Sequence, residues 1–263
     1  MNKTLLFISL VLITSVFVTA NYNVVPSNGH ASVSIPEHVI QLAPGVFSLG
    51  TSVIDGKVVE GLMFVHYARN NNAKPSAGGG LTCYSFLAKG AKWKSLENWV
   101  VNPSNIQSLD GNFVLNNLAL DVQKWEDASL LNILGDGSLT NDVLVADTSS
   151  PDNRNEVYFG NIAEPGAIAV TIVWGIFSGP PQVRELVEWD QVYDQFDFPW
   201  SSSGEAGKMD FENIATHELG HSVGMGHPPS DCVEETMYAY ADFGETKKRT
   251  LNAGDVKGIQ EMY

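Results

Sequence analysis

The segment HELGHSVGMGH, residues 217–227, is the feature that most restricts how this chain can fold. It contains three of the six histidines in the 263-residue chain: His217, His221 and His227. Asp210 has the residue type of a helix N-cap, so we expect a helix through FENIATHELGHSVG. On such a helix residues 217 and 221 project from one face, with Cβ atoms roughly 6 Å apart. Both imidazoles can therefore reach a single metal ion.

The rest of the segment completes a catalytic metal site. Gly224 can adopt a positive φ that ends the helix, so that the chain turns and His227 returns as a third ligand. Three protein ligands leave a fourth position open, which is typical of catalytic zinc rather than structural zinc. We therefore predict one Zn²⁺ held by His217, His221 and His227, with Glu218 beside it as the general base. The alternative is a chance HExxH on a polar helix face, which the third histidine at this offset disfavours.

HELGHSVGMGH resembles the extended motif of the metzincin clan of zinc endopeptidases, and further segments resemble its matrixin branch, the matrix metalloproteinases. ETMYAY places Met237 where such proteins have a methionine turn beneath the metal. GDVKGIQEMY resembles their last catalytic-domain helix, KWKSLENWVVNPSN their first strand, and Trp125 the tryptophan of their first helix. The resemblance covers about residues 84–263. It implies that Met237 supports the site and that Asp255 braces the methionine turn from the final helix.

Several positions depart from the metzincin patterns. Matrixins usually hold a second, structural zinc with further histidines, and residues 81–263 have none to spare, so we predict a single zinc. Gly254 stands where matrixins have an acid that pairs with the new N-terminus, so this pairing is not expected here. Ala239 stands where serralysins and astacins place a ligating tyrosine. Tyr238 and Tyr240 are therefore predicted to be walls of the substrate pocket rather than ligands.

The start of the chain, MNKTLLFISLVLITSVFVTA, has the layout of a secretory signal peptide over residues 1–20. A basic residue, Lys3, precedes an apolar run and a small-residue cleavage site at Ala20. An uncleaved membrane anchor is the alternative, but the apolar run is short for a span. We expect a protein that is exported and, in its mature form, soluble and extracellular.

Residues 21–80 are predicted to be a propeptide and residues 81–263 the catalytic domain. The boundary segment NNNAKPSAGGG has the composition of an exposed linker. Before it, Asp55-Gly56 lies between β-branched runs, which predicts a hairpin. The alternative is that residues 21–80 form an ordinary N-terminal subdomain.

The remaining pattern predicts an α+β fold. Helical spacing of Val114, Leu118, Val122 and Trp125 predicts an early helix. AIAVTIVWGIF reads as a central strand, ELVEWDQVYDQFDF as a strand nearer the edge, and NAGDVKGIQEMY as a final helix. Strands that precede most of the helices are typical of α+β domains. The matrixin resemblance adds a twisted mixed sheet, an active-site helix and a C-terminal helix, preceded by a small β-containing prosegment.

The two cysteines, Cys83 and Cys232, are expected to form a disulfide, because an exported chain with an even count favours one. The surroundings of Cys83, GLTCYSF, do not match the cysteine segment that keeps matrixins latent. In the chain-entropy model this loop of about 150 residues contributes about 5 kcal/mol. A turn-rich stretch contains the acids Asp136, Asp142, Asp147, Asp152 and Glu156. They are a candidate Ca²⁺ site, with a solvated polar loop as the alternative.

The formal net charge of −15 disfavours nucleic acids and anionic membrane surfaces as partners and favours a monomer. We predict a zinc endopeptidase that acts on proteins or peptides. The main alternative is a secreted zinc-binding or inhibitory module without catalysis, which the presence of Glu218 disfavours. A gluzincin-type peptidase would use Glu234 or Glu235 as the third ligand, a role that His227 makes unnecessary.

Overall fold

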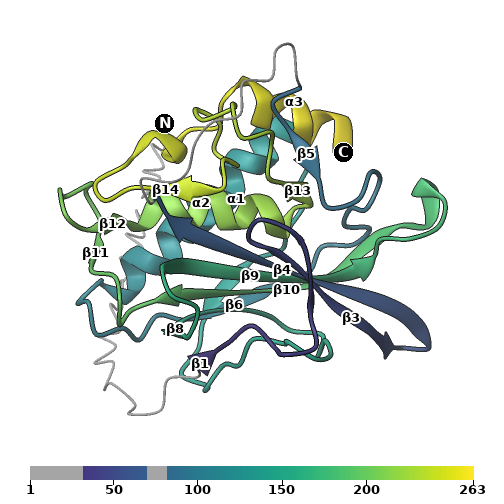
Figure 1. Ribbon diagram of the computed structural model, residues 1–263, viewed down its shortest axis with the longest axis horizontal. Helices are drawn as coiled ribbons and strands as arrows, with labels where there is room; N and C mark the ends of the chain where they lie inside the picture. Colours follow the sequence, from purple (N-terminus) through teal and green to yellow (C-terminus); the bar gives the residue numbers. More distant parts are fainter. Residues whose placement is uncertain (1–31, 70–81) are drawn as a thin grey trace, which may run out of the picture.

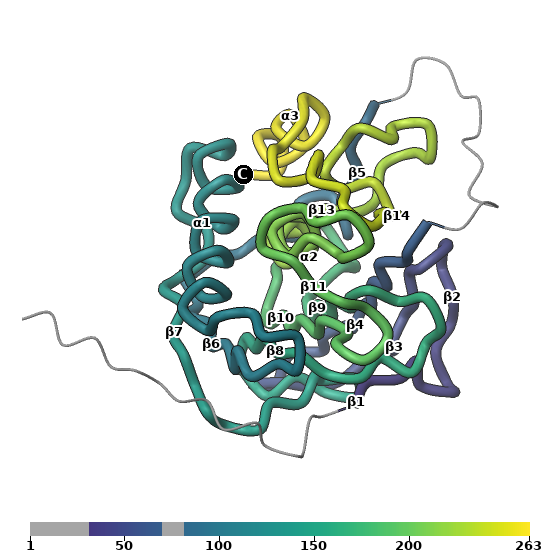
Figure 2. Tube along the Cα trace, turned by 90° about the vertical axis from the view of Figure 1, so that its left-hand side faces the viewer, coloured from purple at the N-terminus to yellow at the C-terminus, as the bar shows by residue number. Residues whose placement is uncertain are grey.

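The computed structural model describes residues 32–69 and 82–263. The predicted signal peptide and the linker segment lie outside the described residues. One large mixed sheet forms the centre of the molecule, and helices cover one of its faces (Figures 1 and 2). Among the described residues, no helix is long and apolar enough to cross a membrane.

The sheet has the strand order β2-β3-β4-β9-β10-β8-β6-β7. Strands β6, β7, β8 and β10 run parallel to their neighbours in this group, whereas β9 is antiparallel to β10 and to β4. Two short strands pair outside this path, β1 with β8 and β14 with β4. The strands are β1 (Ser32–Val33), β2 (Ile40–Ala43), β3 (Val46–Ile54), β4 (Lys57–Ala68), β5 (Ser85–Phe86), β6 (Trp99–Asn102), β7 (Gly137–Leu139), β8 (Asn155–Ile162), β9 (Ala167–Ile176), β10 (Glu185–Asp194), β11 (Trp200–Ser201), β12 (Met209–Asp210), β13 (Met225–Gly226) and β14 (Tyr240–Ala241).

The predicted N-terminal hairpin is confirmed as β3 and β4. Its turn residues Asp55 and Gly56 both have positive φ, 50° and 76°, as a two-residue turn of this kind requires. The hairpin does not form a layer of its own. It extends the sheet formed by the later part of the chain, because β4 pairs with β9 over much of its length.

The three predicted helices are confirmed. Helix α1 (Gly111–Ser129) buries Val114, Leu118, Val122 and Trp125, the residues that share its apolar face. Helix α2 (Phe211–Ser222) begins after Asp210, whose side chain accepts a hydrogen bond from the amide of residue 213, and α3 (Ala253–Met262) closes the chain. Two short 3₁₀ turns, η1 (Pro181–Val183) and η2 (Lys247–Arg249), complete the regular structure of the described part.

Two strand predictions need correction. Strand β10, expected near an edge, lies between β9 and β8 in the interior of the sheet. Its alternating polar residues, Glu188 and Asp190 among them, are buried, and they accept hydrogen bonds from the backbone of the loop before β8. Strand β8 was expected to be part of a turn-rich stretch, yet it is a buried strand, because the turn-forming residues end just before it.

Apolar side chains form one cluster on each face of the sheet. The inner cluster faces the helices and includes Val114, Trp125, Ile214 and Ile259. Its buried members all lie after residue 90. The outer cluster lies on the opposite face and combines two parts of the chain. From residues 32–68 it takes Val33, Phe47, Leu49, Val59, Met63 and Val65, and from the later segment Leu144, Ala146, Tyr158, Ile162, Ala167, Val170, Ile172, Trp174 and Val192.

Candidate active site

The structure brings the three predicted ligands together at the end of α2. His217 and His221 project from the same face of the helix, and His227 approaches from the chain that follows Gly224, where φ is 102°. One nitrogen from each ring lies within 4.8 Å of the others. The ring centroids of His221 and His227 are 4.8 Å apart, and those of His217 and His227 are 5.3 Å apart.

Backbone carbonyls fix the orientation of two of these rings. Nδ1 of His217 lies 2.7 Å from the carbonyl oxygen of Thr236, and Nδ1 of His221 lies 2.9 Å from that of Met225. A carbonyl can only accept, so both Nδ1 atoms carry the proton and both Nε2 atoms present a lone pair. Burial lowers the pKa of all three imidazoles, to about 3 for His221. The neutral ring is the form that binds metals.

The donor set fits a zinc ion. Nε2 of His217 is buried and has no hydrogen-bond partner, although burying such an atom without one is costly. Nε2 of His221 lies 3.2 Å from Nε2 of His227. Three inward-facing imidazole nitrogens, two of them on rings whose Nδ1 is tied to a backbone carbonyl, are the ligand type and support that Zn²⁺ uses.

Glu218 lies beside this cluster and is fully buried. Its Oε2 accepts a hydrogen bond of 2.5 Å from the hydroxyl of Thr171 on β9. Burial raises the pKa of Glu218 to about 8, although the hydrogen bond from Thr171 acts in the opposite direction. The carboxyl group is therefore a stronger base than an exposed glutamate.

Two further residues reach the site that sequence reasoning did not single out. Nζ of Lys248 lies 2.9 Å from Nε2 of His66, and Nδ1 of His66 lies 2.9 Å from Oε1 of Glu218. When Lys248 is charged its ammonium can only donate, and His66 then accepts at Nε2 and donates from Nδ1 to Glu218. Burial lowers the pKa of Lys248 to about 7. The signal in the sequence that could have indicated this contact is His66, a single histidine near the end of an apolar strand.

The methionine turn packs directly beneath α2. A Cβ atom on Gly220 would lie 2.2 Å from Sδ of Met237 and 2.7 Å from the Trp125 ring, so only glycine fits there. Asp255 accepts hydrogen bonds from the backbone amides of Thr236 (2.7 Å) and Met237 (3.1 Å). Because Thr236 also bonds the first ligand through its carbonyl, the carboxylate of α3 is linked to the metal site through this turn.

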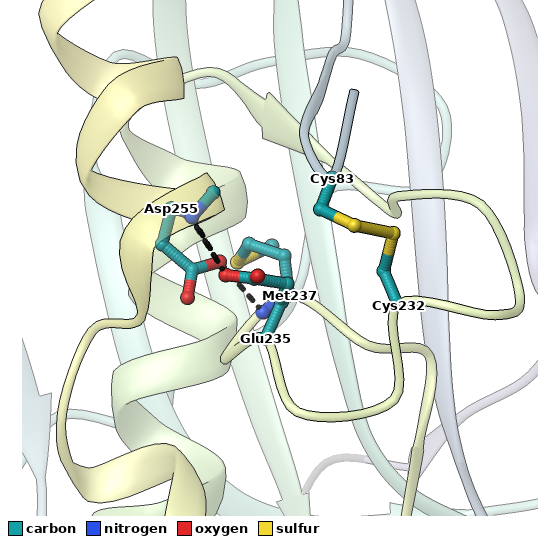
Figure 3. The surroundings of a disulfide bond; sticks show 6 residues. Cys83, Cys232, Glu235, Met237 and Asp255 are labelled. Atoms are coloured by element: carbon teal, nitrogen blue, oxygen red, sulfur yellow. Dashed lines mark hydrogen bonds between the residues drawn. A yellow bond between two sulfur atoms is a disulfide. The ribbon is translucent and has the colours of Figure 1, made fainter. Parts of the chain in front are cut away.

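The disulfide lies beside this turn (Figure 3). Cys83 and Cys232 are joined with a Cα–Cα distance of 5.5 Å. Nearby, Oε2 of Glu235 accepts from the amides of Gly254 and Asp255 at the start of α3. A Cβ atom on Gly254 would lie 2.1 Å from the carbonyl oxygen of Cys83, so the backbone of residue 83 occupies the space that a larger residue would need.

A cavity of about 830 Å³ opens next to the cluster. His227 lines it together with the two predicted wall residues, Tyr238 and Tyr240. On its other side the cavity is bounded by residues of β3 and β4, including Phe64. The N-terminal hairpin is thus part of the wall of the cleft.

Of the candidate Ca²⁺ acids, the structure brings only some together. Asp147 and Asp152 approach Glu188 of β10, with one carboxylate oxygen of each within 4.8 Å of the others. Asp142 instead pairs with Arg154, at 2.7 Å. Oε1 of Glu188 is buried and has no hydrogen-bond partner. Burial, together with the charge of Asp147, raises the pKa of Glu188 to about 8.

Comparison with known proteins agrees with this geometry. The matrixin family model matches residues 176–263, which include the cluster, the methionine turn and α3. Residues 176–263 are thus matrixin-like. It is similar to matrilysin of Homo sapiens, with 39% identity over 74 residues, covering 28% of this chain and 26% of the relative. It is also similar to metalloendoproteinase 2-MMP of Arabidopsis thaliana, with 27% identity over 148 residues, covering 53% and 34%.

The chain therefore spans about a third or less of the length of these relatives. The matrixin match begins at the last residue of β9, so the early helix and the N-terminal hairpin lie outside it. The hairpin residue His66, which contacts Glu218, consequently belongs to a part of the chain that the matrixin pattern does not describe.

Proposed function

We propose that the protein is a zinc-dependent endopeptidase that is exported and made as a latent precursor. The observation that carries this proposal is the juxtaposition of three neutral imidazoles and a buried carboxylate, Glu218, in a matrixin-like domain. The names of the similar proteins, matrilysin and metalloendoproteinase, support the same activity.

His217, His221 and His227 would hold a single Zn²⁺ ion, which would supply the Lewis acidity needed to polarise a peptide carbonyl. The chain's own residues supply the rest of the chemistry. Glu218 would take a proton from the attacking water and deliver it to the leaving amine. Thr171 would orient the carboxylate through its bond to Oε2, and Met237 with Asp255 would hold the floor of the site in place.

Residues 1–20 would direct export and residues 21–80 would act as the propeptide. This part of the proposal is supported by the composition of the first twenty residues and by the position of β4 against Glu218. Protein N-terminal sequencing of the secreted form would test both boundaries. A mature form that retains residues 32–68 in full activity would contradict the propeptide role.

The peptidase activity is tested with denatured casein and the zinc-loaded protein after removal of the propeptide. We expect cleavage that a zinc chelator stops and added zinc restores. Glu218→Ala should keep its zinc and its fold but lose activity by about 10²–10⁴-fold, the usual contribution of a general base. A folded, zinc-loaded Glu218→Ala variant with full activity would contradict the mechanism. Zinc binding without any cleavage would favour the alternative, a binding or inhibitory module.

A Ca²⁺ ion between Asp147, Asp152 and Glu188 is a second part of the proposal. The unpartnered, buried Oε1 of Glu188 supports it, because a cation would compensate the three close carboxylates. Thermal unfolding with and without Ca²⁺ tests it, with Glu188→Gln as the variant that should no longer respond.

A further inference from the structure

Strand β4 lies between β3 and β9 in the sheet, and it covers the edge that β9 would otherwise expose beside the candidate active site. It pairs antiparallel with β9 from Glu60 opposite Gly175 to Tyr67 opposite Ala167. Strand β9 also supplies Thr171, the residue that bonds Glu218. Docking onto a sheet edge is a common way for proteins to bind extended peptides. The edge that a substrate would need is therefore already taken by the chain itself.

On its other side, the end of β4 meets the segment that follows the methionine turn. Tyr67 and Ala68 pair in parallel with Tyr240 and Ala241, and the amide of Arg69 donates to the carbonyl of Ala241 at 2.8 Å. The last two residues of β4 thus lie between β9 and β14, whereas the rest of the strand lies between β9 and β3 (Figure 1). The backbone of β4 is therefore hydrogen-bonded on both sides.

The inward side chains of β4 cover the catalytic groups. The ring of Phe64 stacks on His221, with centroids 4.1 Å apart, and the ring of His66 lies over His217, with centroids 3.9 Å apart. His66 also bonds Glu218, and Lys248 bonds His66 from behind. With β4 in this position, Glu218 and the first two ligands have no exposed surface. Neither a water molecule nor a peptide carbonyl can reach the base.

We propose that β4 keeps the enzyme latent by lying in the place of the substrate, and that His66 is the positioning residue that fixes it to Glu218. This inference rests on the proposed peptidase function. A cysteine does not hold the latent state in this arrangement, because Cys83 and Cys232 are bonded to each other. The contact to the base is made by an imidazole between a lysine and a carboxylate.

The structure offers two independent ways to release the strand. His66→Ala removes the bond to Glu218. Gly61→Val leaves the catalytic groups untouched and weakens the packing of β4. A Cβ atom on Gly61 would lie 2.7 Å from the ring of Trp174 and 2.9 Å from Cβ of Leu49, so the larger side chain would collide with both. Matched controls are His38→Ala, an exposed histidine of the same segment, and Val53→Ala, an exposed residue of β3.

The full-length, zinc-loaded proteins are compared by two measurements. The first is amide hydrogen exchange of residues 57–68 and 167–176 without substrate, and the second is kcat/KM on a quenched fluorescent peptide. We expect both release variants to exchange faster in these two strands but not in α2. We expect their kcat/KM to rise at least about tenfold, because a larger fraction of molecules has an open site. The two controls should match the wild type in both measurements.

A crosslink provides a test that does not depend on weakening the fold. Val65 and Val170 are opposite each other, and the Val65 amide bonds Gly45 rather than β9, so they form a non-hydrogen-bonded pair. The Cα atoms of such pairs are about 4.5 Å apart, within the range of a disulfide. In the His66→Ala background, Val65→Cys with Val170→Cys should be inactive when oxidised and active when reduced. His66→Ala alone, in the same reductant, controls for the native disulfide.

The outcomes separate the two proposals. The proposed latency through β4 is wrong if the wild type cleaves as fast as both release variants. It is also wrong if the oxidised crosslink leaves activity unchanged. In either case the proposed peptidase function stands. A second outcome is faster exchange in the release variants with no cleavage by any variant or by the protein after removal of residues 21–80. This outcome overturns the proposed peptidase function and, with it, the proposed latency through β4.

Discussion

The two faces of the sheet are built differently. The inner cluster, under the helices, takes its buried residues from the later part of the chain alone, and it carries α2 and the metal ligands. The outer cluster needs the N-terminal segment, whose six residues pack against nine from the later part. The difference predicts that the inner cluster and α2 keep their packing when the N-terminal hairpin separates from β9, whereas the outer cluster loses it.

The largest effect is expected from Trp125→Ala in the inner cluster. The substitution removes a fully buried ring and its hydrogen bond to the carbonyl of Thr216, one residue before the first ligand. We expect a loss of about 3–5 kcal/mol in the free energy of unfolding and a weakened affinity for zinc. Chemical denaturation and zinc titration measure both. An unchanged zinc affinity in a destabilised variant would show that the packing of the inner cluster does not influence zinc binding.

Met63→Ala removes a fully buried side chain from the outer cluster. We expect a cost of about 2 kcal/mol or more, confined to attachment of the hairpin. Hydrogen exchange should quicken in residues 46–68 and stay unchanged in α2. An equal rise of the exchange rate in residues 46–68 and in α2 would mean that the two faces unfold as one unit, which would contradict the difference between them.

Gly220→Ala tests how tightly the inner face is packed at the site itself. The added methyl group would collide with Met237 and Trp125, so we expect a loss of about 1–3 kcal/mol. Activity of the mature enzyme should fall together with stability, because α2 carries two ligands and the base. Thermal unfolding and kcat measure the two effects. A variant of wild-type stability would show that the helix can shift without cost.

The smallest effect is expected at the acidic cluster before β8. Because the pKa of Glu188 is raised in the folded state to about 8, the folded protein holds a proton that the unfolded chain releases above about pH 4.5. The protonated Glu188 therefore contributes to the free energy of unfolding at low pH, and this contribution is lost as the pH rises towards 8. Glu188→Gln should flatten that decline, and Ca²⁺ should oppose it in the wild type. A decline of the same slope in Glu188→Gln would exclude this residue as its cause.

The sequence predicted best what local rules determine. The spacing of His217 and His221, the cap at Asp210 and the turn at Gly224 are all consequences of helix geometry. The contacts between distant segments could not be predicted in this way. His66 and Lys248 are 182 residues apart, and His66 reaches both Lys248 and Glu218 only because β4 pairs with β9. The buried acids of β10 misled the edge assignment for a related reason, since their partners lie in a loop.

The proposed activity depends above all on one zinc ion held by three histidines beside Glu218. Its most direct test is the zinc content of the purified full chain, measured by atomic emission after dialysis, for the wild type and for His221→Ala. We expect one zinc ion per wild-type chain and a large loss of zinc in the variant. A well-folded wild type that retains no zinc after incubation with the metal, or a variant that retains as much as the wild type, would contradict it.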